Sequence, residues 1–218
     1  HTNWNLLKWF NKIIFPISWR IADAVVWEIG NDEDTNIRRF SGQTNVSYIP
    51  FAIDLSLQPS TSNVAIFKQK FSLDSSKINL MTVSRLRLFE KRIDLMIHAL
   101  KILKDRGFDD YHLYLVGDGS DRSEIEELII KLDLNCITTI TGYQDSPISI
   151  MSLCDVYLVA TADGETGISG LQAGSLSKPC LGIEVSNPNA LSTYISLSTS
   201  SAELADKIIE LRDSEFYK

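Results

Sequence analysis

The sequence is poor in the residues that build disulfide frameworks and zinc sites. It has three cysteines, Cys136, Cys154 and Cys180, which stand far apart without a C-x-x-C pair, and three histidines. No recognised metal-ligand spacing combines these residues, so we expect no metal site and no zinc enzyme. Because each cysteine lies in an apolar stretch, we expect all three in the core of a protein from a reducing compartment, which favours a cytoplasmic location.

Positive charge and long apolar runs are also scarce. Lys and Arg number 21 against 28 Asp and Glu, a formal net charge of −7. A broad nucleic-acid surface needs an excess of positive charge, so we expect no nucleic-acid partner. No run approaches the ~20 apolar residues that span a bilayer, and the N-terminus lacks the apolar core of a secretory signal. The 218 residues, 44% of them hydrophobic, indicate a folded chain of one large or two small domains.

From residue 78 onward, strand-like and helix-like segments alternate, which is typical of a parallel sheet covered by helices. Strands are expected at Ile78–Val83, His112–Val116, Ile137–Thr141, Val156–Ala160 and Pro179–Val185, with a weaker one at Tyr194–Leu197. Helices are expected at Glu90–Arg106, Asp121–Leu134, Ser146–Cys154, Thr166–Leu176 and Ser201–Asp213, the last with Ser201 as N-cap. The fold class predicted is α/β, a Rossmann-like doubly wound parallel sheet.

The first part of the chain has a different pattern. A helix is expected at Trp4–Phe15, ended by Pro16, then a short helix near Ile17–Asp23 and a strand at Ala24–Ile29. We therefore assign residues 1–50 to part of another domain, residues 51–77 to a linker or interdomain crossing, and residues 78–218 to the Rossmann-like domain.

In doubly wound sheets, ligands bind beyond the carboxyl ends of the strands where the strand order reverses. With the common order 3-2-1-4-5-6, that point brings residues 84–91 opposite residues 161–167. The first segment carries Arg85, Arg87 and Lys91, and the second has glycines ahead of a helix N-terminus. Cations facing the free N–H groups of a helix suit a diphosphate. The alternatives are a solvated approach to a helix for the cations and close helix packing for the glycines.

Other candidates have plainer explanations. Gly117-Asp-Gly119 resembles a nucleotide loop, but a turn after a strand explains it. Asp32-Glu-Asp34 looks like the metal-binding D-x-D of some sugar transferases, although acids at a helix start usually serve as capping residues. His98 is expected to be packed or at a helix edge rather than a base. Asp163 and Glu184 are the carboxylates nearest the predicted site.

The chain resembles a known family, the GT-B glycosyltransferases of the family 4 type. The similarity covers about residues 22–217 through six motifs in the correct order. They are NVSYIPFAID (45–54), VSRL (83–86) with EKRIDL (90–95), LVGDG (115–119), ITG (140–142), CDVYL (154–158) and QAGSLSKPC (172–180). The corresponding family patterns are V-x-V-I-P-N-G-V-D, G-R-L with K-G-x-D-L-L, I-V-G-D-G, F-x-G, A-D-V-F-V and E-A-M-A-x-G-K-P-V.

The resemblance implies a nucleotide-sugar donor site in the C-terminal domain. It places the donor diphosphate on Arg85 and Lys91, assisted by the amides of 167–169, namely Gly167, Ile168 and Ser169, and the nucleotide base near Gly142 and Tyr143. It further implies sugar transfer with retention in polysaccharide or glycoconjugate synthesis, and no divalent metal or other cofactor. The partners would be a UDP-, GDP- or ADP-linked sugar and a glycan or lipid-linked acceptor.

The sequence departs from the family pattern at its acidic pair, E-x7-E. With Gln172 in the second position, which binds the donor ribose, Gly164 falls in the first. Glu165 could replace the first acid by a shift of one residue and contact the sugar, and Gln172 can still hydrogen-bond a ribose hydroxyl. The spacing from Arg85 to Lys91 is one residue longer than usual, so Arg87 could partly take over.

Alternative functions stay open. A non-catalytic nucleotide-sugar-binding or scaffold subunit would keep the fold, and residues 1–50 resemble only the last elements of the family's N-terminal domain, so we expect the isolated chain to bind donor without transferring sugar. A nucleotide-sugar epimerase shares the fold. A dinucleotide oxidoreductase is disfavoured, because no G-x-G-x-x-G follows the first strand. Residues 4–15, with Lys8 and Lys12 beside an apolar face, suit either peripheral membrane contact or packing on the rest of the N-terminal domain.

Overall fold

The computed structural model describes residues 25–27, 46–48, 52–161, 167–184 and 196–213, and divides the chain into two units, 1–52 and 53–218. In the first unit, β1 (Val25–Trp27) pairs in parallel with β2 (Val46–Tyr48), and β1 lies within the strand predicted at Ala24–Ile29. The helix predicted at Trp4–Phe15, the short one after it and the D-x-D segment lie outside the described residues.

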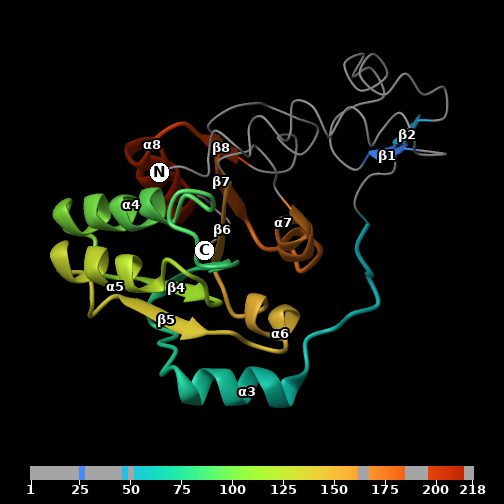
Figure 1. The fold of residues 1–218 in the computed structure, drawn as a ribbon. Helices are drawn as coiled ribbons and strands as arrows, with labels where there is room; N and C mark the ends of the chain where they lie inside the picture. Colours follow the sequence, from blue (N-terminus) through green and yellow to red (C-terminus); the bar gives the residue numbers. More distant parts are fainter. Residues whose placement is uncertain (1–24, 28–45, 49–51, 162–166, 185–195, 214–218) are drawn as a thin grey trace. The chain divides into compact units, whose positions relative to one another are not determined.

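The second unit is built on a six-stranded parallel sheet (Figure 1). Its order is β5-β4-β3-β6-β7-β8, which confirms the predicted 3-2-1-4-5-6 arrangement and the Rossmann-like fold class. The strands are β3 (Ile78–Val83), β4 (Tyr111–Val116), β5 (Thr138–Gly142), β6 (Val156–Thr161), β7 (Cys180–Glu184) and β8 (Ser196–Ser198). Each begins within two residues of its predicted start. The apolar runs of β3, β4 and β6 are buried on both faces of the sheet, which is why they predict strands clearly.

Helices cover both faces of this sheet. One layer packs on the side chains of Leu80, Leu113 and Leu115, and the other on those of Met81, Tyr114 and Val116, as the alternation of strand side chains requires. The first layer holds α4 (Ile93–Asp105), α5 (Arg122–Lys131) and α8 (Ser201–Asp213), and the second holds α3 (Thr61–Lys70), α6 (Pro147–Met151) and α7 (Gly167–Ser175).

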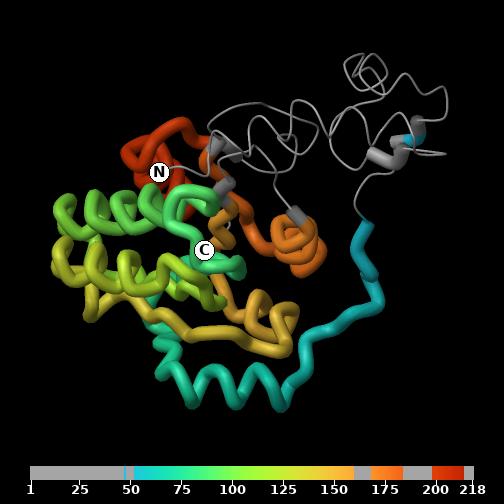
Figure 2. The backbone as a smooth tube through the Cα atoms, in the orientation of Figure 1, coloured from blue at the N-terminus to red at the C-terminus, as the bar shows by residue number. Residues whose placement is uncertain are grey.

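Helix α8 packs against α4, which lies far away in the sequence (Figure 2). The N-cap of α8 differs from the predicted Ser201. The cap is Ser200, whose Oγ accepts a hydrogen bond from the N–H of Glu203 at 3.2 Å, and not Ser201, which is the first helical residue. Thr199 donates its N–H to Glu203 at 2.6 Å, completing a reciprocal arrangement at this helix end. The Thr199 bonds lower the pKa of the exposed Glu203 carboxyl to about 2.

Helix α3 lies within the segment that the sequence suggested as a linker. Its Phe67 is buried and packs with Phe71 and Tyr114, with ring centroids 4.6 Å and 6.3 Å from that of Phe67. Ser60, just before the helix, donates its N–H to the buried Ser149 of α6 at 2.9 Å. Residues 60–71 are therefore part of the second unit's core and not a free connection.

The three cysteines are free thiols in two different environments. Cys154 and Cys180 are buried, and desolvation raises the pKa of Cys154 to about 12 and that of Cys180 to about 11. Cys136 is exposed just before β5, so the expectation that all three lie in the core was wrong at this position. Its neighbour Ile137 supplies the apolar contact that made the stretch resemble core.

Candidate functional site

The site predicted from the strand order lies where β3 and β6 separate. These strands are paired only through Leu80 with Val156 and Met81 with Tyr157, so the carboxyl end of β3 continues without a backbone partner on that side. On the other side, Val83 remains in register with Val116 of β4. The chain reverses its winding direction here, which opens the position where ligands bind in such folds.

The hydroxyl of Tyr157 takes the place of the missing strand. It accepts a hydrogen bond from the N–H of Val83 at 3.1 Å and donates to the carbonyl of Val83 at 3.3 Å. Burial raises the pKa of Tyr157 to about 12, while hydrogen bonds to Ser169 of α7 and to the Val83 backbone act in the opposite direction. Tyr157 thus links the end of β3 to the first turn of α7.

The loop after β3 gathers its cations around one carboxylate. Arg85 donates to Glu90 Oε1 at 2.9 Å, Lys91 Nζ lies 4.0 Å from the same oxygen, and Arg87 Nε lies 3.3 Å from Oε2. The side chain of Arg85 is 73% exposed, whereas those of Glu90 and Lys91 are 34% and 26% exposed. The structure therefore brings together the two residues predicted to clamp a diphosphate, on a shared anion.

Arg87 is held differently from Arg85. Its NH1 donates to Ser120 Oγ at 2.7 Å, and Ser120 in turn hydrogen-bonds Asp121, which accepts the N–H of Leu88 at 3.0 Å. These bonds lower the pKa of the Asp121 carboxyl, with the Ser120 bond the largest cause. Arg87 is thereby fixed to the loop after β4, which makes Arg85 the freer arginine.

Gly117 and Gly119 allow the loop after β4 to lie directly against the loop after β3. A Cβ at Gly117 would overlap the carbonyl oxygen of Ser84, and one at Gly119 would overlap that of Leu86. Leu86 donates its N–H to Asp118 at 3.0 Å across this contact. The explanation of the GDG segment as a turn is consistent with this arrangement, and the turn packs directly against the cationic loop.

Arg92 occupies the position of the glycine in the family's K-G pattern. Its φ of 46° lies in the left-handed region, and it directly precedes the first residue of α4. Its guanidinium Nε is 3.5 Å from Asp94 Oδ1. The backbone conformation that a glycine would adopt readily is therefore kept by an arginine.

The remaining predicted site residues lie on two further elements. Gly142 ends β5 with φ 71°, and Tyr143 after it is 76% exposed. Gly167 begins α7, Ile168 is exposed, and Ser169 and Gln172 are half-buried on the same helix. Their roles toward a nucleotide stay predictions, and Asp163, Gly164 and Glu165 lie outside the described residues.

Two residues of the site were not singled out by the sequence. Glu90 was noted only as part of a motif, although its position between cations was a usable signal. Tyr157 was assigned to a strand, and the hydrogen bonds between its hydroxyl and the Val83 backbone show that it reaches the end of β3. His98 is exposed on α4 with Nδ1 2.6 Å from the carbonyl of Asp94, in agreement with its expected place at a helix edge.

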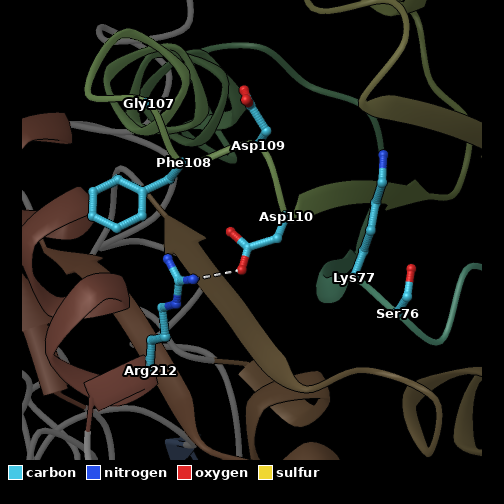
Figure 3. A pocket seen from close by; sticks show the side chains of 7 residues that line it. All are labelled: Ser76, Lys77, Gly107, Phe108, Asp109, Asp110 and Arg212. Carbon is cyan, nitrogen blue, oxygen red and sulfur yellow. Dashed lines mark ion pairs between the residues drawn. The ribbon is translucent and has the colours of Figure 1, made fainter.

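A pocket of about 480 Å³ lies at the opposite edge of the sheet (Figure 3). It is lined by Ser76, Lys77, Gly107, Phe108, Asp109, Asp110 and Arg212, at the amino ends of β3 and β4. Within it, Arg212 pairs with Asp110 at 2.8 Å and lies over the ring of Phe108. Because the Rossmann-like rule places ligands at the carboxyl ends, we do not assign the donor to this pocket.

The described residues contain no group of three or more His, Cys, Asp or Glu side chains able to hold a metal ion. None of the helices in the described part of the chain combines the length and apolar character that crossing a bilayer requires. Metal independence and the membrane contact suggested for residues 4–15 stay predictions.

Comparison with known proteins identifies the family. The profile of the glycosyl transferases group 1 matches residues 63–215, which is most of the chain. The chain belongs to this family. The match includes β3, α7, the cationic loop and five of the six motifs, so the resemblance to the family is confirmed; the segment NVSYIPFAID at 45–54 lies outside the matched residues.

Relatives of this family member share its fold at low identity. N-acetyl-alpha-D-glucosaminyl L-malate synthase of Bacillus anthracis is 24% identical over an alignment of 157 residues, with 69% of this chain and 40% of that protein covered. Anabaena HepE in complex with UDP and glucose has a TM-score of 0.75 at 18% identity, covering 93% of this chain and 57% of its own. Pneumococcal O-GlcNAc transferase GtfA, in complex with UDP and GlcNAc, has a TM-score of 0.61 at 21% identity, covering 86% and 39%. The family member described here thus spans about half the length of these proteins.

Proposed function

We propose that this chain binds a nucleotide-sugar donor for retaining sugar transfer in polysaccharide or glycoconjugate synthesis. The observation that carries the proposal is the convergence of Arg85 and Lys91 on one oxygen of Glu90, at the carboxyl end of β3 where the strand order reverses. Two cations that already share one anionic oxygen are placed to share a diphosphate.

The chemistry of such a site is the stabilisation of a leaving group. When the bond between the sugar and the diphosphate breaks, negative charge develops on the diphosphate oxygens. Fixed cations stabilise that charge without a metal ion, and free backbone N–H groups at the start of α7 can add to the effect. In this proposal the amides of Gly167, Ile168 and Ser169 assist Arg85 and Lys91.

The other parts of the donor follow from the same placement. The base would lie against Gly142 and the exposed Tyr143, and the ribose would accept or donate a hydrogen bond at Gln172. Glu165 would contact the sugar. The UDP present in the structures of HepE and GtfA supports testing UDP-sugars first, beside GDP- and ADP-sugars.

The test is the double variant R85A/K91A. Loss of two charge-assisted hydrogen bonds should weaken nucleoside-diphosphate binding by about 2–4 kcal/mol, measured by calorimetry across UDP, GDP and ADP. A matched control is K104A/R106A, which removes two cations at the end of α4, Lys104 and the C-cap Arg106, that pair with Asp133 and Asp206. Equal affinity of wild type and the folded R85A/K91A variant would remove these residues from the site.

A second candidate, a non-catalytic donor-binding subunit, is favoured by the neutral Gln172 in place of the family's acid. In a two-domain transferase, bringing donor and acceptor into register is worth about 7–11 kcal/mol of the barrier. We therefore expect the 218-residue chain to bind donor without turnover, in assays with and without candidate glycan or lipid-linked acceptors. Multiple turnovers by the chain alone would contradict this expectation.

A further inference from the structure

Glu90 stands where the donor diphosphate is proposed to bind. Its Oε1 receives Arg85 at 2.9 Å and lies 4.0 Å from Lys91, and its Oε2 lies 3.3 Å from Arg87. We propose that Glu90 is an internal anion that occupies the diphosphate position on Arg85 and Lys91 and is displaced by the donor. The inference rests on the proposed function, since it assigns a role within the same site.

The backbone on both sides of Glu90 is held by buried side chains and hydrogen bonds, whereas its partly exposed carboxylate is held by ion pairs. Leu86, Leu88 and Ile93 are buried at 0%, 8% and 0% exposure. The N–H of Leu88 is bound by Asp121 at 3.0 Å, and the N–H of Ile93 by the carbonyl of Leu88 at 3.0 Å. The carboxylate can therefore leave the cations by rotating its own side chain, with no rearrangement of the loop.

Charge determines which anion the cations prefer. Three cationic groups around one carboxylate leave an excess of positive charge, and exposed ion pairs of this kind contribute only about 0–1 kcal/mol each. A diphosphate brings more negative charge and more acceptor oxygens than a carboxylate, so it displaces the carboxylate of Glu90 from the cations. In the empty site, Glu90 reduces the repulsion between the cations.

The two arginines respond differently to this exchange. Arg87 has a second partner besides Glu90, because its NH1 donates a hydrogen bond to Ser120 at 2.7 Å. The side chain of Arg85 is 73% exposed and is paired with Glu90. When Glu90 leaves, Arg85 can bind a new anion instead. Glu90 therefore sets the affinity for the diphosphate, and by returning to Arg85 and Lys91 it speeds the release of the nucleoside diphosphate.

The experiment compares wild type with E90Q, which keeps the size of the side chain and removes its charge, and with E90A. Binding of UDP, GDP and ADP is measured by calorimetry, their release by stopped-flow, and binding of the parent nucleosides serves as the phosphate-free probe. D206N is the matched control, because it also removes one carboxylate that pairs with an arginine, Arg106, on the α4–α8 surface. Thermal unfolding verifies that each variant is folded.

Removal of the competing charge should tighten nucleoside-diphosphate binding about tenfold in E90Q and E90A and slow its release. Nucleoside binding and the D206N control should not change. Equal or weaker diphosphate binding in both Glu90 variants would overturn the inference, because a residue that merely positions Arg85 and Lys91 loses affinity when removed. Absence of diphosphate binding in wild type and variants alike would instead overturn the proposed function, and the role of Glu90 with it.

Discussion

At the scale of single residues, glycines control how closely the loops of the site approach. Gly117 has φ 139° and faces the carbonyl of Ser84, so it combines a conformation that other residues avoid with a contact that excludes a Cβ. Gly107 has φ 84° but open space around it, and Gly174 of α7 has open space and no positive φ. Gly117 therefore combines steric overlap with backbone strain, Gly107 has backbone strain alone, and Gly174 has neither.

Substituting these glycines by alanine should give three different outcomes. G117A should destabilise the chain by about 2–4 kcal/mol, since the overlap is with backbone that cannot move aside. G107A should cost about 1 kcal/mol through backbone strain alone, and G174A should stabilise α7 by about 0.5–1 kcal/mol. Urea unfolding of the three variants measures the series, and a G117A variant as stable as G107A would contradict the close contact.

The sequence predicted some of these residue roles and missed others. The GDG turn followed from its position after a strand. The convergence of Arg85 and Lys91 on one oxygen of Glu90 could not be predicted, because the conformation of the loop that ends at Arg92 includes the left-handed φ of that residue. A side chain's partners in an irregular segment follow from backbone angles that no periodic pattern encodes.

At the scale of elements, the end of β3 depends on a hydroxyl from β6. Tyr157 satisfies both backbone groups of Val83 at the point where the two strands part. Without that hydroxyl, a partly buried N–H and C=O would have no partner in place of the missing strand. The geometry of the cationic loop, which begins one residue later, therefore depends on a strand that lies across the switch point.

The variant Y157F should lower the free energy of unfolding by about 1–3 kcal/mol, because it leaves the Val83 groups unpaired while keeping the ring. S169A, which removes the hydroxyl's other partner, should cost less. Chemical denaturation of Y157F, S169A and the double variant forms a double-mutant cycle. If Y157F and wild type unfolded at the same denaturant concentration, the hydroxyl would have no structural role.

Most elements of the second unit were predictable, and one was not. The strands and the amphipathic helices α4 and α5 carry clear apolar periodicity. Helix α3 buries Phe67 as its single core side chain and begins among polar residues, so its pattern resembles a linker. Its helical state depends on packing against α6 and the sheet, which a local pattern does not contain.

At the scale of the whole molecule, stability should depend on pH through His112. Its ring lies 4.5 Å from that of Tyr114, and its Nε2 is 2.8 Å from Thr139 Oγ1. Burial and nearby Lys77 lower the pKa of His112 from 6.5 to about 4, with a smaller opposing effect of Asp74. Between pH 6.5 and about 4, His112 binds a proton in the unfolded chain but stays neutral in the folded chain, so the free energy of unfolding falls as the pH is lowered.

The expected loss between pH 6.5 and 4 is on the order of 1–2 kcal/mol, since partial exposure of the ring weakens the effect. Urea unfolding at several pH values measures it. H112Q should flatten the dependence in this range. An equally steep dependence in H112Q would assign the effect to other groups.

The order of the strands was predicted correctly from their alternation with helices, and the rule for doubly wound folds then places the proposed site at their carboxyl ends. The pocket around Arg212 lies at the amino ends of β3 and β4, so that rule does not predict a ligand there. The placement of side chains within the proposed site could not be predicted from the sequence, because it depends on how the loops that follow three different strands pack together.

The unequal exposure of the three cysteines makes the native chain suitable for site-specific labelling. A maleimide dye needs a thiol that it can reach, and Cys136 is exposed, whereas Cys154 and Cys180 are buried and burial raises their pKa values to about 12 and 11. Cys136 precedes β5, at the sheet edge opposite the cationic loop. A fluorophore there would report on the molecule without engineered thiols and without touching Arg85, Glu90 or Lys91.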